Sequence, residues 1–168
     1  MSGGLGAREA QLSDAAQIAA IYNQGIADRV ATFETEPRSV EQIEAWFGVA
    51  LAIVAATAPG GDVIGYAAAF PYSDRSCYGG IGEFSVYVRR AERGQGVGRI
   101  AMAGLIEAAR RRGLWKLVSR VFPENRASRS LLAAVGFREI GVHEKHGRLD
   151  GAWKDAVIVE RLIPENID

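Results

Sequence analysis

The chain has 168 residues, of which 48% are hydrophobic and 24% charged, and its formal net charge at pH 7 is zero. This length predicts one domain with a sizeable core, and zero net charge argues against a general affinity for nucleic acid or anionic membrane. The single cysteine, Cys77, excludes an intramolecular disulfide. Neither a signal peptide nor an apolar run near the ~20 residues of a membrane span is apparent. A cytoplasmic protein is therefore expected.

The first quarter of the chain predicts a disordered tip followed by two helices. Residues 1–7 are expected to form the tip. Asp14 precedes Gln17 by three residues, which is the spacing of a capping box, and apolar residues then recur on one face of a helix over 14–26. Ser39 stands three residues before a second glutamine and predicts the start of the next helix.

The middle of the chain predicts a hairpin and then a strand–helix–strand crossover. Two apolar segments, 51–57 and 63–72, flank a Pro-Gly-Gly turn and read as paired strands. The segment 81–88, IGEFSVYV, has the clearest strand pattern. Apolar residues at helical spacing then predict a helix from residue 97 that ends at Gly113, and the segment 115–122, WKLVSRVF, predicts the next strand.

The last quarter predicts a short helix over 125–135, ended by Gly136, and two strands within 138–162 joined by a polar, Gly-containing loop. The order of all elements indicates an α/β domain with a mixed sheet. Its expected extent is 8–163, with 164–168 as a C-terminal tail.

A glycine-rich loop, residues 93–98 (RGQGVG), lies between the strand over 81–88 and the helix that follows. Free N–H groups at a helix start, together with glycines that allow close approach, are typical of phosphate binding. The loop lacks the Lys-Ser/Thr pair of a Walker loop, and Arg99 stands where a dinucleotide fingerprint needs its third glycine. A tight turn without a ligand is the alternative.

The loop resembles the acetyl-CoA pyrophosphate loop of the GNAT acetyltransferases, [QR]-x-x-G-x-[GA]. The segment NRASRSLLAAVGF, residues 125–137, resembles the family's N-x-x-[SA]…G-F element. The resemblance implies the GNAT fold, with a mixed, mostly antiparallel central sheet flanked by helices, and acetyl-CoA as cosubstrate. The cofactor-binding residues that it implies are Val86, Tyr87, Val88, Arg93, Gly94, Gln95, Gly96, Val97, Gly98, Arg99, Asn125 and Ser128.

Three further segments narrow the resemblance to phosphinothricin N-acetyltransferase-like enzymes. They are YGGIGEFSVYV (78–88), GRLDGAWKD (147–155) and IYNQGIADRVATFETEP (21–37), so the likeness runs over about residues 8–162. The resemblance implies acetylation of the α-amine of a small amino acid or analogue such as phosphinothricin, methionine sulfoximine or arsinothricin. It also implies a homodimer.

Glu83 is the candidate catalytic base. A protonated amine must lose a proton before it attacks a thioester, and a carboxylate can accept that proton directly or through a water. Glu83 is charged within an otherwise apolar or small strand, and it shares a face with Ser85 and Tyr87. The alternative is a glutamate on a solvated face, or an ion-pair partner of Arg75 or Arg120.

The departing thiolate needs little assistance, because a thiol pKa lies near ~8.5. The family often has a tyrosine or histidine seven residues after the motif asparagine, whereas this chain has Leu132. A general acid at that position is excluded, and another tyrosine, a water or no acid remain open. The resemblance implies that backbone N–H groups along 86–88 stabilise the oxyanion.

Substrate recognition is expected to need a cation, since the implied substrates carry a carboxylate or a second acidic group. Arg75 matches one of two basic residues usual in the group, while Ser73 replaces the other. A solvated loop arginine is the alternative for Arg75, core packing is the alternative for Phe33, and holding the last hairpin together is the alternative for Trp153. The full substrate-binding set is Phe33, Thr35, Arg75, Tyr78 and Trp153.

Two other functions stay open. The acceptor can be another amine or a protein N-terminus, or the domain can bind acyl-CoA without turnover. No metal site is expected, because His143 and His146 have no third ligand nearby in the sequence.

Overall fold

A computed structural model describes residues 4–168 of the chain. Its seven-stranded sheet has the order β1-β2-β3-β4-β5-β7-β6, and β4–β5 is the one parallel pair among the described strands. The strands are β1 Gly6–Glu9, β2 Ala52–Thr57, β3 Val63–Pro71, β4 Ile81–Val88, β5 Lys116–Val121, β6 Arg138–Leu149 and β7 Ala152–Leu162. The helices are α1 Ala15–Asp28, α2 Val40–Trp46, α3 Val97–Arg111 and α4 Arg126–Ala134. The predicted α/β fold with a mixed, mostly antiparallel sheet is confirmed.

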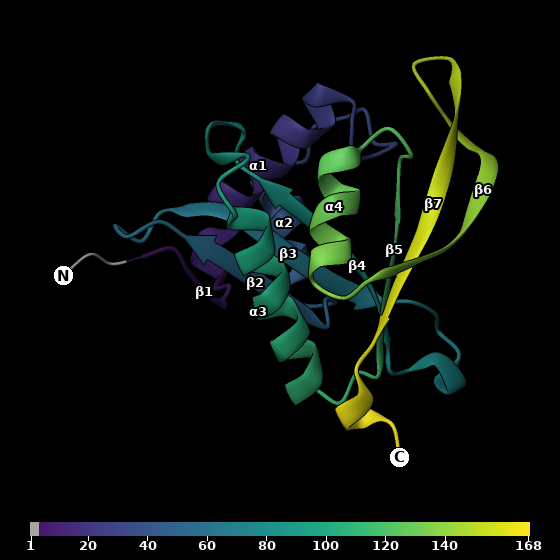
Figure 1. Cartoon of the computed structure of the whole chain (residues 1–168). Coiled ribbons are helices and arrows are strands. Elements are labelled where there is room, and N and C mark those ends of the chain that lie inside the picture. The colour runs from purple at the N-terminus through teal and green to yellow at the C-terminus, as the bar shows by residue number, and fades with distance from the viewer. Residues whose placement is uncertain (1–3) are drawn as a thin grey trace.

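The helices cover the two faces of the sheet (Figure 1). One core cluster joins apolar residues of α3 and α4 to one face, and a second joins α1 and α2 to the other. Side chains alternate along a strand, so the two clusters divide β4: Phe84 belongs to the α3 side and Tyr87 to the α1 side. Every second residue of β4 therefore faces each layer.

The strands β4 and β5 run together only at their start. Their parallel pairing covers three residue pairs and ends at Glu83 and Val118. One hydrogen bond follows, from Ser119 Oγ to the Phe84 carbonyl at 2.7 Å. Beyond it the two strands diverge, and the rest of β4 has a strand neighbour only on its β3 side.

The long hairpin β6–β7 extends the sheet beyond β5. Its two-residue turn has Asp150 and Gly151 at φ 50° and 80°, which is the left-handed geometry of a type I′ turn. Arg29, just after α1, pairs with Asp150 at 3.0 Å. The turn of this hairpin is therefore tied to the loop between α1 and α2.

The predicted helices and strands are found close to their expected bounds, with one correction at the start of α1 and another at the N-terminus. Asp14 does not cap α1 with Gln17: its carboxylate accepts from Arg8 and from the Gln11 N–H, and Gln17 Oε1 accepts from the Val63 N–H. The Ser39 capping box is confirmed.

The predicted N-terminal tip, 1–7, is partly wrong. Residues 1–3 lie outside the described residues, whereas Gly6 and Ala7 belong to β1 and pair with β2. Ala7 also lies beside Gly104 of α3: a Cβ atom added to Gly104 would lie 3.1 Å from the Cβ of Ala7. The strand forms because it covers the open edge of β2, a tertiary contact that a four-residue segment cannot signal alone.

Within residues 4–168, no helix is long and apolar enough to cross a membrane.

Candidate active site

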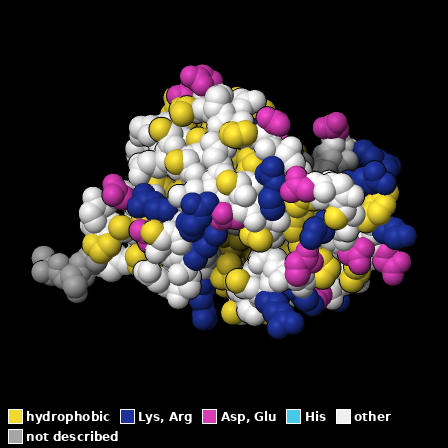
Figure 2. Space-filling model, turned by 90° about the horizontal axis from the view of Figure 1, so that it is seen from above, with side chains coloured by type: hydrophobic (Ala, Val, Ile, Leu, Met, Phe, Trp, Pro, Cys, Tyr) yellow, Lys and Arg dark blue, Asp and Glu magenta, His cyan; other side chains and the backbone are white. Residues whose placement is uncertain are grey.

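A cavity of about 620 Å³ fills the gap where β4 and β5 diverge. Its walls come from β4, β5, the glycine loop 93–98, α4 and the loop after α1, including Val30 and Ala31. In the view from above, Lys and Arg are interspersed with Asp and Glu, and apolar side chains are visible in a recess (Figure 2). We call this space the β4–β5 cleft.

The glycine loop forms the end of the cleft next to α3. Gly94 and Gly96 have φ of 79° and 83°, a conformation that side chains rarely adopt, and the space beside both α-carbons is open within residues 4–168. Gly96 is the N-cap of α3, so the first N–H groups of that helix face the loop without intrahelical partners. This cradle fits an anionic phosphate, as the loop pattern predicts.

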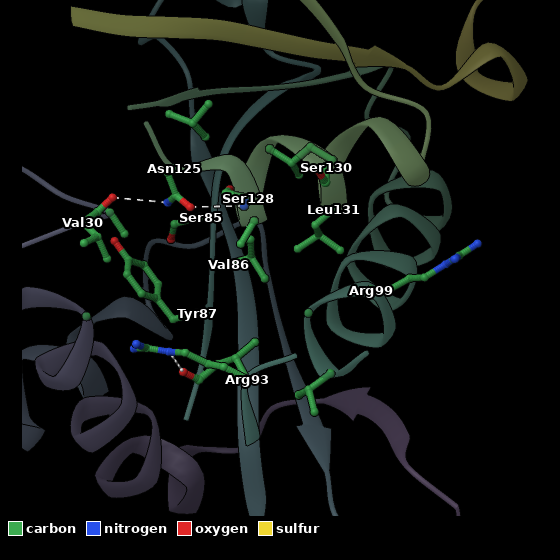
Figure 3. A pocket seen from close by; sticks show the side chains of 18 of the residues that line it. Val30, Ser85, Val86, Tyr87, Arg93, Arg99, Asn125, Ser128, Ser130 and Leu131 are labelled. Carbon is green, nitrogen blue, oxygen red and sulfur yellow. Dashed lines mark hydrogen bonds between the residues drawn. The ribbon is translucent and has the colours of Figure 1, made fainter. Parts of the chain in front are cut away.

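The loop's first arginine is held from outside the cleft. Arg93 Nη1 lies 2.6 Å from Asp28 Oδ2 of α1. Arg93 Nε also donates to the Val88 carbonyl at 3.2 Å (Figure 3). Arg90 binds the same carboxylate at 2.7 Å. These two guanidinium groups, Arg90 foremost, lower the pKa of Asp28. Asp28 therefore fixes the loop to α1, while Arg99 remains at the mouth of the cleft without an ion pair among the described residues.

The helix α4 supplies the opposite wall. Asn125 accepts from the Ser128 N–H and donates to the Val30 carbonyl, both at 3.2 Å, so it links α4 to the loop after α1 (Figure 3). Leu132 is 1% exposed and lines the cleft. The position seven residues after Asn125, where the family often has a tyrosine or histidine, therefore holds an apolar side chain that cannot act as a general acid.

Backbone N–H groups of β4 point into the cleft. The Arg89 N–H donates to the Ile64 carbonyl of β3 at 2.8 Å. Since hydrogen bonding alternates along an antiparallel pair, the N–H groups of Val86 and Val88 point the other way, toward the side from which β5 has diverged. They can donate to an oxygen in the cleft.

Glu83 lies directly before the part of β4 that lines the cleft, which begins at Phe84, and is not itself among the lining residues. Its strand position is the last one paired with β5, and its half-exposed side chain faces the α1 side like Tyr87. The Glu83 Oε1 atom is 3.7 Å from Arg120 Nη2. The alternative partner Arg120 is therefore real, but the distance is longer than a hydrogen bond and leaves the carboxylate free to accept one.

An aromatic cluster supports β4 on the α1 side. Tyr87 packs edge-on to Tyr22 and stacks on Tyr66, with ring centroids 5.1 and 5.7 Å away. The α1 helix approaches closely because residue 25 is glycine: a Cβ there would lie 2.6 Å from the Tyr87 ring. Burial raises the pKa of Tyr87, so its hydroxyl stays protonated at neutral pH.

The predicted cofactor residues are brought together almost completely. Gln95 is the exception, since it does not line the cleft and its Nε2 is directed to the Ala91 carbonyl at 3.4 Å. The ones that line the cleft are Val86, Tyr87, Val88, Arg93, Gly94, Gly96, Val97, Gly98, Arg99, Asn125 and Ser128.

The predicted substrate residues are not brought together. Phe33 packs edge-on against Phe122 at 4.9 Å and touches Gly147 of β6, beyond the end of β5, and Thr35 is exposed in the same loop. Arg75 and Tyr78 lie in the loop before β4, with the Arg75 guanidinium 5.6 Å from the Tyr78 ring. These two loops lie at opposite ends of β4 (Figure 1).

Trp153 lies on the β6–β7 hairpin. It is 53% exposed, and Arg148 lies 4.6 Å from its ring. None of the five substrate candidates lines the β4–β5 cleft within one chain.

Sequence reasoning missed two residues of the site. Asp28 gave no signal, because the partners that it binds are more than 60 positions away. Arg120 does give one, because it is a charged residue within a strand just as Glu83 is, although the sequence by itself suggests only an ion-pair partner for Glu83.

Comparisons with known proteins agree with this geometry. The acetyltransferase (GNAT) family model matches residues 18–137. L-methionine sulfoximine/L-methionine sulfone acetyltransferase of Pseudomonas aeruginosa is 32% identical over 157 residues, 91% of each chain. Phosphinothricin N-acetyltransferase of Streptomyces coelicolor is 31% identical over 147 residues, 84% of this chain and 86% of its own.

A solved structure extends the likeness to three dimensions. The phosphinothricin acetyltransferase of Sinorhizobium meliloti in complex with AcCoA has a TM-score of 0.87 and 27% identity, covering 97% of this chain and 89% of its own. The family model spans more than two thirds of the sequence, and the two sequence relatives span most of it. The chain therefore belongs to the GNAT family, as an acetyl-CoA-dependent N-acetyltransferase akin to the phosphinothricin and methionine sulfoximine acetyltransferases.

Proposed function

We propose that the protein acetylates the α-amine of a small amino acid or analogue of the phosphinothricin, methionine sulfoximine or arsinothricin type, with Glu83 as base. The observation that carries the proposal is the divergence of β4 and β5 directly after Glu83. The resulting cleft begins at Phe84, the residue after Glu83, and extends to the glycine loop, so a phosphate-bearing thioester in the cleft and an amine beside Glu83 would lie next to each other.

Each proposed step uses a named group. The amine nitrogen attacks the thioester carbonyl, a C–N bond forms, the C–S bond breaks, and the sulfur leaves as thiolate. Glu83 accepts the proton that the nitrogen loses. The N–H groups of Val86 and Val88 stabilise the charge that develops on the carbonyl oxygen. Leu132 offers no proton, and a thiolate with a conjugate-acid pKa near ~8.5 departs without one.

The amine side of the site is proposed to combine several loops. Phe33 and Thr35 lie in the loop after α1, with Phe33 packed on Phe122 just beyond β5, while Arg75 and Tyr78 precede β4 and Trp153 lies on the last hairpin. The names of the sequence relatives support a small amino-acid acceptor, since they refer to methionine sulfoximine, methionine sulfone and phosphinothricin.

A homodimer is part of the proposal. Supporting it, β6 is exposed along most of its length, and Ile140, Val142 and Trp153 are 47%, 54% and 53% exposed on this hairpin. Light scattering coupled to size exclusion at micromolar concentration is expected to give twice the chain mass of 18.0 kDa. A monomer across the concentration range would contradict this part.

The activity is tested by thiol release from acetyl-CoA with a panel of acceptors. We expect turnover with L-phosphinothricin or L-methionine sulfoximine, and lower kcat/KM with simple alkylamines and with peptides that carry a free N-terminus. A preference for peptides would replace the proposal with protein N-terminal acetylation. Turnover of alkylamines alone would replace it with a general amine acetyltransferase.

A further inference from the structure

Arg120 is a cation at the cleft that no motif includes. Leu117 and Val121 of β5 pack toward α3, and Phe122 meets Phe33 on the other face. Side-chain alternation therefore directs Arg120 to the α1 side, the same side as Glu83. It also lines the cleft. The cation thus lies next to the candidate base and away from the core.

The pairing between Arg120 and Glu83 is loose. Their closest atoms are 3.7 Å apart, whereas Asp28 and Glu139 bind their arginines at 2.6 and 2.7 Å. Within residues 4–168, the guanidinium of Arg120 donates no hydrogen bond, and its side chain is 46% exposed. Both members of the pair therefore retain unused hydrogen-bonding capacity on the side of the cleft.

This pair matches the head of an α-amino acid. Such a head carries an ammonium and a carboxylate on one carbon atom, so a site for it needs an acceptor and a cation side by side. Glu83 provides the first and Arg120 the second, at adjacent positions. A guanidinium binds a carboxylate with two parallel hydrogen bonds. We propose that Arg120 binds the α-carboxylate of the substrate while Glu83 receives its amine.

The inference rests on the proposed function and deepens it. It assigns a cation to the amine side, where Ser73 replaces one of the expected basic residues and where Arg75 lies outside the cleft. Arg120 moves no proton: it selects and orients the amino acid, so a plain amine without a carboxylate is a poor acceptor.

The test compares L-methionine sulfoximine with its α-carboxamide in the wild type, Arg120→Ala and Arg120→Lys. We expect Arg120→Ala to raise KM for the acid by about 10- to 100-fold and to change KM for the amide by less than about twofold, since only the acid loses a charged hydrogen bond. Arg120→Lys keeps the charge but loses the pair of parallel hydrogen bonds. Its KM for the acid is therefore expected to lie between those of the wild type and Arg120→Ala. The carboxamide also changes the basicity of the amine. The ratio of the KM for the acid to the KM for the amide is therefore compared across the variants.

Arg111→Ala is the matched control. It removes an equal charge from the end of α3. Arg111 is 56% exposed there, and its ion pair with Glu9 is loose, with the closest atoms 4.0 Å apart. We expect its kinetics to equal those of the wild type. Calorimetry with acetyl-CoA is expected to give the same Kd for Arg120→Ala as for the wild type.

Three results would overturn the inference. If Arg120→Ala leaves the KM for the acid unchanged, Arg120 does not bind the substrate. If its KM rises equally for acid and amide, Arg120 does not recognise the carboxylate. A weaker acetyl-CoA Kd assigns it to the coenzyme. If Arg120→Ala does not fold, the inference is tested by the KM values of Arg120→Lys and by the preference of the wild type for the acid over the amide. Wild type inactive on every amino acid but active on peptides refutes the proposed function itself, and this inference with it.

Discussion

The coenzyme side and the amine side of the β4–β5 cleft are built in different ways. The coenzyme side uses backbone: the N–H groups of Val86 and Val88, and a glycine loop whose positive φ angles open it to an anion. Most of it comes from the short stretch 84–99. The amine side, as proposed, relies on side chains of separate segments, among them Glu83 of β4 and Arg120 of β5, which meet at 3.7 Å.

This difference explains which side of the cleft binds the ligand shared by the family and which side determines the acceptor of this enzyme. Backbone groups are the same whatever the side chain, so a loop built from them binds the ligand that a whole family shares. Side chains on separate segments can change one at a time without altering the fold. Ser73, Leu132 and Arg120 are three such positions in this chain. The amine side therefore decides what is specific to this enzyme.

The largest expected effect is at the boundary between the two sides. Glu83→Gln should lower kcat near pH 7 by about 10²- to 10⁴-fold, because the amide cannot accept the amine proton. Acetyl-CoA affinity should not change, as measured by calorimetry. Glu107→Gln on the outer surface of α3 is the matched control. Wild-type turnover by Glu83→Gln would remove this residue from catalysis.

Damage to the coenzyme side should affect binding of acetyl-CoA alone. Gly96→Ala forces a side chain into the left-handed region at φ 83°, which costs about 1–2 kcal/mol. We expect the Kd for acetyl-CoA to rise by about tenfold and the KM for the amino acid to stay constant. Gly60→Ala in the β2–β3 turn, where space is open and φ is not left-handed, is the control. A change in amino-acid KM alone would contradict the division into two sides.

Asp28 sharpens the comparison, because it supports the glycine loop without lying in it. Asp28→Asn weakens two ion pairs, and the KM for acetyl-CoA should rise by about three- to tenfold. Arg90 and Arg93 lower the pKa of Asp28, so its ion pairs stabilise the fold above the ordinary carboxyl pKa of ~3.9 and lose this effect as pH falls through the lowered value. The difference in Tm between wild type and Asp28→Asn should therefore shrink as the pH is lowered through the depressed pKa of Asp28. A constant difference would show that the carboxylate charge is not involved.

The smallest effect is expected at Arg75. Its loop precedes β4 and is solvated, so Arg75→Ala should raise the KM for the amino acid by about three- to tenfold and change kcat less. The rise should be smaller than that for Arg120→Ala. Steady-state kinetics with L-phosphinothricin measures both. If KM does not move, Arg75 binds no substrate anion.

The extent to which sequence predicted the molecule follows the same division. The crossover from β4 to α3 to β5 and the phosphate cradle were predicted, because their signals are local: strand alternation, helical spacing and glycines at set positions. β1 was missed because its four residues form a strand only against β2. Asp14 was given the wrong partner, since the guanidinium of Arg8 outcompetes a cap.

Long-range contacts explain the gaps at the site. No spacing in the sequence connects Asp28 with Arg93, or Arg120 with Glu83, because each pair meets only after the sheet has formed. The substrate candidates stay predictions, and sequence alone did not reveal that the loop after α1 and the loop before β4 lie at opposite ends of β4.

The early end of the β4–β5 pairing has a consequence for hydrogen exchange. Amides of β4 that are bonded to β3, such as Tyr87, are protected, whereas those of Val86 and Val88 open onto the cleft. In the free enzyme, deuterium should therefore enter this strand at alternate residues, and a bound ligand that fills the seam should slow only the fast set.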